Sequence, residues 1–123
     1  MILRTVNLTK RFAGLTALAD VNAGIEQGEI FGIAGPNGAG KSTFFNVVAG
    51  ACPPSDGEIY FNGQNITGLK PHRTCHLGIG RTFQIPRTFQ TLTVYENLKI
   101  GAAFGRAAGR RRPDRKQLNA RVE

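Results

Sequence analysis

The chain has 123 residues, of which 41% are hydrophobic and 20% charged, so it corresponds to at most one globular domain and is neither disordered nor collagen-like. Its 16 glycines are about twice the usual share and follow no Gly-X-Y period, which predicts a site built from glycine. The net charge is +8, but residues 106–123 alone carry seven basic and two acidic side chains. This local excess argues against a nucleic-acid-binding surface over the whole fold.

The sequence contains no sign of a membrane span or of a disulfide framework. No run reaches the ~18 apolar residues that cross a bilayer, and Arg4 interrupts the N-terminus before an apolar signal-type core forms. Cys52 and Cys75 are too few for a disulfide framework and belong to no Cys-x-x-Cys pair. We therefore expect a cytosolic chain with reduced thiols.

Three short runs near the N-terminus have the pattern of β-strands. They are residues 2–8, 21–25 and 29–34. The third run, Glu-Ile-Phe-Gly-Ile-Ala, is mostly apolar and suits a buried strand of a parallel sheet. Phe12, Leu15 and Leu18 fall in the expected connection between the first two strands.

A helix is expected to begin at Lys41, because Phe44, Val47 and Val48 share one helical face, and to end at Gly50. The later elements follow from turn and capping signals. We expect a strand over 57–62 with an Asn62-Gly63 turn, a helix over 71–76, a strand over 79–83, a helix over 94–104, a basic loop over 105–113 and a helix over 115–123. Thr93 and Glu96 form the capping-box pattern that starts the helix over 94–104.

Residues Gly35 to Thr43 satisfy the G-x-x-x-x-G-K-[ST] pattern and lie between an apolar strand and an amphipathic helix, which is the context that a phosphate-binding loop requires. Glycines let successive backbone amides face inward at the positive end of the following helix. We expect these residues to bind the phosphates of a nucleotide: Gly35, Pro36, Asn37, Gly38, Ala39, Gly40, Lys41, Ser42 and Thr43.

Lys41 and Ser42 have separate expected roles. The Lys41 ammonium reaches the β- and γ-phosphates as a point charge, and the Ser42 hydroxyl completes the oxygen shell of a magnesium ion. A glycine-rich turn that only joins a strand to a helix does not explain a lysine and a serine at this spacing. The loop by itself leaves kinases, GTPases and transport ATPases open.

Further stretches accompany the loop, namely Arg11–Val21, Pro53–Ile59 (PPSDGEI), Pro71–Gln84 with its RTFQ end, and Leu92–Leu98 (LTVYENL). With the loop they resemble the nucleotide-binding domain of ABC transporters and, more narrowly, the ATP-binding subunit of branched-chain amino-acid importers. The resemblance implies an α/β P-loop NTPase fold, here the N-terminal half of the domain. That half has an antiparallel β subdomain and the start of both the parallel core sheet and the helical subdomain.

The resemblance also implies roles for single residues. Phe12 corresponds to an aromatic residue that stacks on adenine, although an ordinary apolar residue at the sheet edge is the alternative. Ala13 stands where the subfamily usually has glycine. Gln84 corresponds to the Q-loop glutamine, which contacts magnesium or the attacking water and relays the nucleotide state to the membrane subunits. Lys41 and Gln84 are then the catalytic residues, and Ser42 and Gln84 the magnesium ligands.

Residues 85–98 correspond to the family surface that receives a coupling helix from the transmembrane subunit. Phe89 and Leu92 fit that interface and the core of the helical subdomain equally well.

Two other site types are less favoured. His72, Cys75 and His76 offer three metal ligands without a fourth, which argues against a metal site. The basic run at the C-terminal end is more often a solvated surface than a nucleic-acid or lipid contact.

A complete ABC nucleotide-binding domain is about twice this length, and three later motifs that the resemblance implies are absent. The chain has no Leu-Ser-Gly-Gly-Gln-like signature, no apolar strand ending in Asp-Glu and no histidine after His76. We therefore expect residues 1–105 to be the N-terminal part of the ATP-binding domain and residues 106–123 the truncated basic start of the helical subdomain. Without the missing strand we expect a marginally stable or partly molten chain with negligible ATP turnover.

The predicted function is that of the ATP-binding subunit of an ABC importer, for branched-chain amino acids, and the parent protein is expected to be an ATPase. ATP and Mg²⁺ are the expected ligands. Two transmembrane permease subunits and a second ATP-binding subunit are the expected partners, with a peripheral location on the cytoplasmic face of the inner membrane. The alternatives are a short non-hydrolysing ATP-binding module, an importer of urea or amides, a lipopolysaccharide exporter, and a nucleic-acid-binding P-loop protein that uses Arg110–Arg112.

Overall fold

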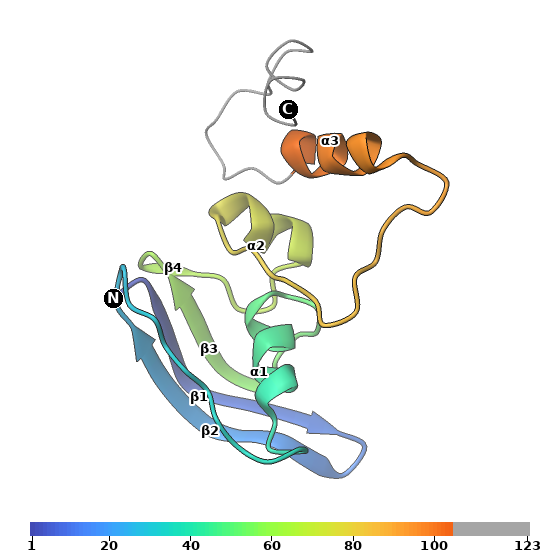
Figure 1. Ribbon diagram of the computed structural model, residues 1–123. Coiled ribbons are helices and arrows are strands. Elements are labelled where there is room, and N and C mark those ends of the chain that lie inside the picture. Colours follow the sequence, from blue (N-terminus) through green and yellow to red (C-terminus); the bar gives the residue numbers. More distant parts are fainter. Residues whose placement is uncertain (105–123) are drawn as a thin grey trace. The chain divides into compact units, whose positions relative to one another are not determined.

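The computed structural model describes residues 1–104 and divides the chain into two compact units, Met1–Pro71 and His72–Glu123. Figure 1 shows the elements in chain order. The first unit holds four strands and one helix, and each unit is described by itself. The expected loop over 105–113 and helix over 115–123 lie outside the described residues.

The first unit begins with a long β-hairpin formed by β1 (Leu3–Phe12) and β2 (Leu15–Ile25). Ala13 and Gly14 both have positive φ, 38° and 91°, as a two-residue hairpin turn requires. The expected long connection was therefore wrong, since Phe12, Leu15 and Leu18 lie within the strands. Register shifts between β1 and β2 near Asn7 and Ala17 interrupt the alternation of inward and outward side chains. The hydrophobic pattern of the sequence therefore did not reveal the full length of the two strands.

The sheet is completed by β3 (Asp56–Phe61) and β4 (Gln64–Asn65), and its order is β2-β1-β3-β4 with every pair antiparallel. The Asn62-Gly63 prediction is confirmed: both residues have positive φ, 48° and 76°, and they join β3 to β4 in a tight turn. The first unit therefore contains the antiparallel sheet that the family resemblance implied.

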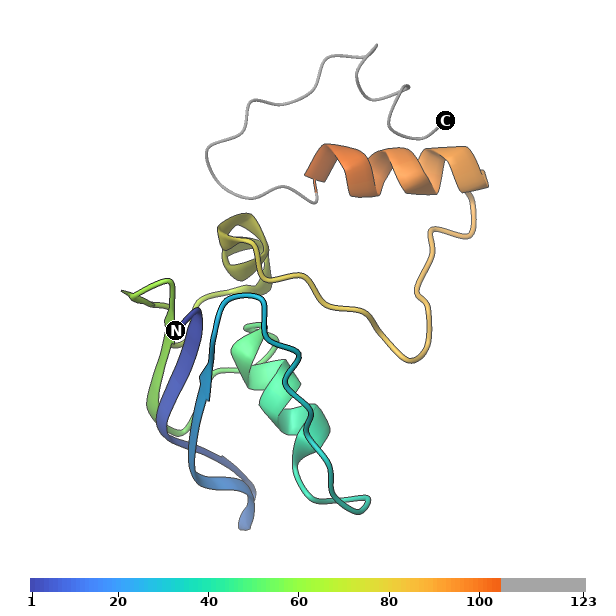
Figure 2. The same ribbon diagram turned by 60° about the vertical axis from the view of Figure 1, so that its left-hand side comes forward.

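Helix α1 (Lys41–Val48) lies along one face of this sheet (Figure 2). The predicted apolar face is confirmed, because Phe44, Val47 and Val48 are buried. The sheet contributes the buried residues Leu8, Leu18 and Ile59 to the same core, and Ile66, which follows β4, is buried as well. The helix ends at Val48, and Gly50 follows with a φ of 80°, as predicted from the glycine.

The segment 29–34 is not a strand, contrary to the sequence-based expectation. A strand exists through hydrogen bonds to a neighbouring strand, and no strand of the described part pairs with this segment. Ile30 is 99% exposed and Phe31 also lies partly in solvent. The apolar composition of residues 29–34 therefore suits a strand inside a sheet, but residues 1–104 contain no neighbouring strand that pairs with them.

The second unit contributes α2 (Pro71–Leu77, whose first residue closes the first unit) and α3 (Val94–Phe104). Both helices were predicted, and α3 has the predicted bounds. The capping box is confirmed: the Thr93 backbone N–H donates to Glu96 Oε2 (2.8 Å), and the Glu96 N–H donates to Thr93 Oγ1 (3.2 Å). Within residues 1–104 no helix combines the length and hydropathy of a membrane span.

Residues 79–83 are not a strand, although they were expected to be one. Gly78 and Gly80 flank the first residue of this run, and glycine in a strand interior weakens it. No other strand is described in the second unit to pair with it.

Candidate functional site

The loop between residue 34 and α1 has the backbone of a phosphate cradle. Gly38 and Gly40 have positive φ, 86° and 83°. The Ala39 N–H donates to the Pro36 carbonyl (3.2 Å), which closes a turn, and the Phe44 N–H donates to the carbonyl of Gly40 (2.9 Å), which starts the helix. Gly40 is therefore the N-cap of α1, and the loop runs directly into the first helical turn.

The N-terminus of α1 is open to an anion. Within residues 1–104 no side chain caps it, and its first turn contains no acidic residue. The free amides and the helix dipole therefore place positive potential at this end of α1 without a competing carboxylate. Ser42 lies exposed in that first turn, where its hydroxyl is accessible to a phosphate or a metal ion.

Gly40 fixes the cradle against β2. A Cβ atom at this position would lie 2.2 Å from the Ala17 carbonyl oxygen, which is much closer than any real contact. Ala17 has no partner on β1, because Lys10 pairs with Leu18 and Arg11 with Thr16. This bulge places the backbone of Ala17 against the loop, so only glycine fits at position 40.

The Lys41 side chain folds back across the loop. Its ammonium donates to the carbonyl oxygens of Gly35 and Pro36, the latter at 2.6 Å. These bonds take two of the three ammonium donors and place the positive charge at the mouth of the loop. The structure therefore brings together the loop residues that the sequence singled out, from Gly35 to Thr43.

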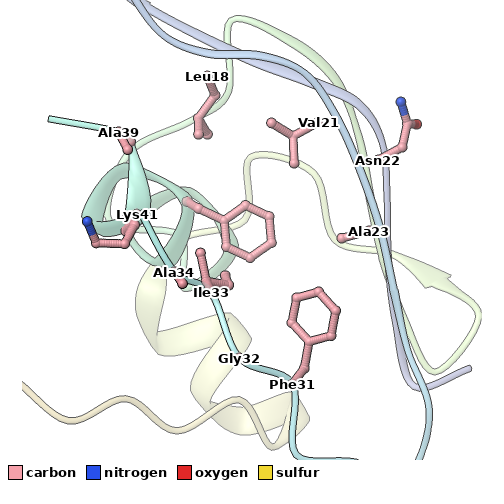
Figure 3. A pocket seen from close by; sticks show the side chains of 12 residues that line it. Leu18, Val21, Asn22, Ala23, Phe31, Gly32, Ile33, Ala34, Ala39 and Lys41 are labelled. Atoms are coloured by element: carbon pink, nitrogen blue, oxygen red, sulfur yellow. The ribbon is translucent and has the colours of Figure 1, made fainter. Parts of the chain in front are cut away.

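A pocket of about 330 Å³ lies beside the loop, between β2, residues 31–34 and α1 (Figure 3). Its lining is mainly apolar and includes Leu18, Val21, Phe31 and Phe44, and among the described lining residues Lys41 supplies the only charged side chain. Its apolar lining offers few donors to a phosphate, whereas the loop beside it has free backbone amides at the start of α1.

Phe12 ends β1 at the tip of the hairpin, and the residue is 45% exposed. The Lys10 ammonium lies 4.9 Å from the ring centroid, in cation–π geometry. Phe12 pairs with Leu15 of β2. Two residues further along β2, the backbone of Ala17 contacts the loop at Gly40. The ring is therefore presented on the same hairpin that supports the cradle.

Gln84 belongs to the second unit and lies exposed in the irregular stretch between α2 and α3. Nearby, the Arg81 guanidinium stacks on the Phe83 ring at 4.8 Å. Phe89 and Leu92 are both exposed in the described part of the chain. Asn97 binds the Phe89 backbone in both directions: the Phe89 N–H donates to Oδ1 (2.9 Å), and Nδ2 donates to the Phe89 carbonyl (3.1 Å).

Comparison with known proteins places this chain in a family. The family model described as ABC transporter matches residues 18–123, most of the chain.

The chain belongs to the ABC transporter family.

Curated members of the family support this assignment. The chain is 50% identical over 99 residues to the probable branched-chain amino acid transport ATP-binding protein LivG of Archaeoglobus fulgidus, a match that covers 80% of this chain and 38% of the relative. It is 42% identical over 99 residues to the high-affinity branched-chain amino acid transport ATP-binding protein BraF of Pseudomonas aeruginosa, covering 80% of this chain and 39% of the relative. The chain thus spans about two fifths of the length of these ABC proteins.

Solved structures confirm the fold of an ABC cassette. A nucleotide-free ATP-binding cassette of an ABC transporter matches with a TM-score of 0.76 at 42% identity, over 87% of this chain and 43% of that one. A dimeric cassette bound to ADP and phosphate matches with a TM-score of 0.82 at 27% identity, over 98% of this chain and 54% of that one. The predicted P-loop NTPase fold, represented by the N-terminal half of the cassette, is therefore confirmed.

The sequence analysis missed three features of this candidate site. The Ala17 bulge left no recognisable signal, because no glycine or proline lies next to it to mark an irregular strand. The contact of Lys10 with Phe12 had a weak signal, since residues two apart on a strand share a face. The hydrogen bond from the Lys10 ammonium to the Pro53 carbonyl (2.7 Å) joins residues 43 apart, and no local pattern predicts it.

Proposed function

We propose that this chain is the nucleotide-binding part of the ATP-binding subunit of an ABC importer for branched-chain amino acids. The observation that carries the proposal is the cradle of residues 35–43, in which Gly40 permits the backbone to approach β2 and Lys41 holds its charge at the loop mouth. The printed names of the curated relatives support the amino-acid class. Within the domain, residues 1–105 form the N-terminal part and residues 106–123 begin the helical subdomain.

The loop and the first turn of α1 fit the triphosphate of ATP. The open amides at the start of α1 bind phosphate oxygens, and the Lys41 ammonium exchanges the Gly35 and Pro36 carbonyls for the β- and γ-phosphates. The exposed Ser42 hydroxyl and the Gln84 amide oxygen offer the hard oxygen ligands that Mg²⁺ prefers. Phe12 presents an exposed ring face for stacking on the adenine base.

The wider assembly follows from the same proposal. The subunit pairs with a second ATP-binding subunit and two permease subunits, as a peripheral protein on the cytoplasmic face of the membrane. Phe89 and Leu92 lie exposed on the segment proposed to receive the permease, and Asn97 fixes the backbone of that segment. Gln84, on the same irregular stretch, relays the nucleotide state to the permease.

The proposal separates binding from hydrolysis. Hydrolysis needs a carboxylate that orients water near the γ-phosphate, and neither the loop over 35–43 nor the first turn of α1 contains an acidic residue. Groups that stabilise the transition state of phosphoryl transfer contribute on the order of 10³–10⁵ in rate. The 123-residue chain is therefore expected to bind ATP with negligible turnover.

Isothermal titration with MgATP tests the binding site. Lys41→Ala is expected to weaken binding by at least about tenfold, which corresponds to the loss of one charge-assisted contact of ~1.5–3 kcal/mol. Lys70→Ala, which removes an equal charge outside the loop, is the matched control and is expected to bind as the parent chain does. Equal binding by the parent chain and Lys41→Ala contradicts the proposal, and so does no binding by either.

A further inference from the structure

Lys10 touches both the aromatic ring at the hairpin tip and the loop that follows α1. Its ammonium lies 4.9 Å from the centroid of Phe12 and donates a hydrogen bond of 2.7 Å to the Pro53 carbonyl. Lys10 and Phe12 share a face of β1 because they are two residues apart on the strand. The half-buried lysine therefore couples the ring to a fixed point of the backbone.

Two further hydrogen bonds hold the backbone that follows Pro53. The Ser55 N–H donates to the Thr9 carbonyl (2.8 Å), and the Arg11 N–H donates to Ser55 Oγ (3.0 Å). Together with the Lys10 contact, these bonds join the end of β1 to the residues just before β3. The Lys10 ammonium thus has a defined position against the Phe12 ring, because the segment that it binds is itself joined to β1.

The position of the ammonium determines which side of the ring stays open. A cation over an aromatic ring is attracted to the electron-rich π face and covers it. Phe12 nevertheless remains 45% exposed, so it keeps surface available to a ligand. A planar base can then stack only on the face that Lys10 leaves free.

We infer that Lys10 is a positioning residue that holds the Phe12 ring in the orientation in which it stacks on the nucleotide base. This inference rests on the proposed function, in which Phe12 binds adenine. The lysine does not contact the phosphates in this role. Its effect is therefore on the base-dependent part of the affinity and not on the affinity for the triphosphate.

The test compares two ligands, MgATP and magnesium tripolyphosphate, which has no base. Dissociation constants for the full chain are measured by isothermal titration, and the ratio between the ligands reports the contribution of the base and the attached ribose. Phe12→Ala is expected to reduce this ratio about 5- to 150-fold, the range measured for base–aromatic stacking. Lys10→Met is expected to reduce it about 2- to 5-fold, the range of an exposed cation–π contact.

Two further variants separate positioning from charge. Arg11→Met removes the same charge from the neighbouring exposed position of β1, and it is expected to leave the ratio unchanged. Lys10→Arg keeps a cation over the ring and is expected to restore the ratio. The double variant Lys10→Met with Phe12→Ala is expected to match Phe12→Ala alone, because a positioning residue has no effect without the ring it positions.

The outcomes distinguish this inference from the proposed function. If Phe12→Ala lowers the ratio but Lys10→Met does not, the inference is wrong and base stacking stands. A ratio that does not respond to Phe12→Ala overturns base stacking and, with it, the role of Lys10. An equal reduction in Lys10→Met and Arg11→Met also overturns the inference, since charge alone then explains the effect. Circular dichroism spectra that match the parent chain establish that each variant is folded.

Discussion

Position 40 makes two demands that only glycine can meet. Its φ of 83° lies in the left-handed region, and a Cβ there would lie 2.2 Å from the Ala17 carbonyl oxygen. Gly38 shares the first demand only, since its φ is 86° but a Cβ would meet open space. An alanine at position 38 therefore costs backbone strain alone, and an alanine at position 40 costs strain and a steric clash together.

Gly40→Ala is expected to destabilise the first unit by about 2 to 5 kcal/mol, because backbone strain and overpacking add, and to weaken ATP binding. Gly38→Ala is expected to cost about 1 kcal/mol, since only the strain remains. Urea unfolding midpoints measure both changes. Equal losses in the two variants would show that the contact with Ala17 does not restrict position 40.

At the scale of elements, α3 is the helix whose start depends most clearly on one ionised side chain. The Glu96 carboxylate accepts the Thr93 backbone N–H, and this bond, helped by the Thr93 hydroxyl, lowers the pKa of Glu96. The bonds favour the ionised form in the folded chain. Their contribution is therefore complete above the unfolded pKa and is lost as the pH falls through the lower, folded pKa.

Acidification below about pH 4, just under the ~4.3 of an unperturbed glutamate, is expected to fray the first turn of α3. NMR chemical shifts and amide exchange of residues 94–97 report this change locally. Glu96→Gln retains an acceptor but does not ionise, so its α3 signals are expected to be insensitive to pH in this range. An unchanged acid response in Glu96→Gln would mean that another carboxyl group controls the helix start.

The elements that sequence predicted well are those specified by neighbouring residues. The Asn62-Gly63 turn, the Thr93 capping box and the helix after Lys41 depend on residues no more than about four apart. The cradle was predictable for the same reason, because its residues are contiguous. The strand over 29–34 and the Lys10 contact with Pro53 depend on distant partners, which local patterns do not specify.

At the scale of the whole molecule, the first unit leaves apolar surface open along residues 29–34. Ile30 is 99% exposed, and Phe31 and Phe45 are exposed as well. Apolar surface of this kind costs free energy in water and binds other apolar groups. Ile59, in contrast to Ile30, is 1% exposed and belongs to the core.

Ile30→Lys is therefore expected to change the free energy of unfolding of this chain by no more than about 0.5 kcal/mol, as for an exposed position. It is also expected to reduce binding of a hydrophobic dye. Ile59→Ala, the buried counterpart, is expected to cost about 2 to 5 kcal/mol. Urea unfolding and dye fluorescence measure these effects, and a large destabilisation by Ile30→Lys would show that residue 30 is buried in solution.

The sheet order also constrains when the cradle forms during synthesis. β3 pairs with β1, yet β2, the loop and α1 all separate them in the chain. The hairpin of β1 and β2 closes first, because a two-residue turn costs little loop entropy, whereas pairing β3 with β1 requires a much longer loop to close. At ~5–20 residues per second, the ribosome releases β3 one to several seconds after the loop. During that interval the nascent chain contains all the phosphate-binding residues but lacks the bonds around Ser55 that fix the hairpin tip.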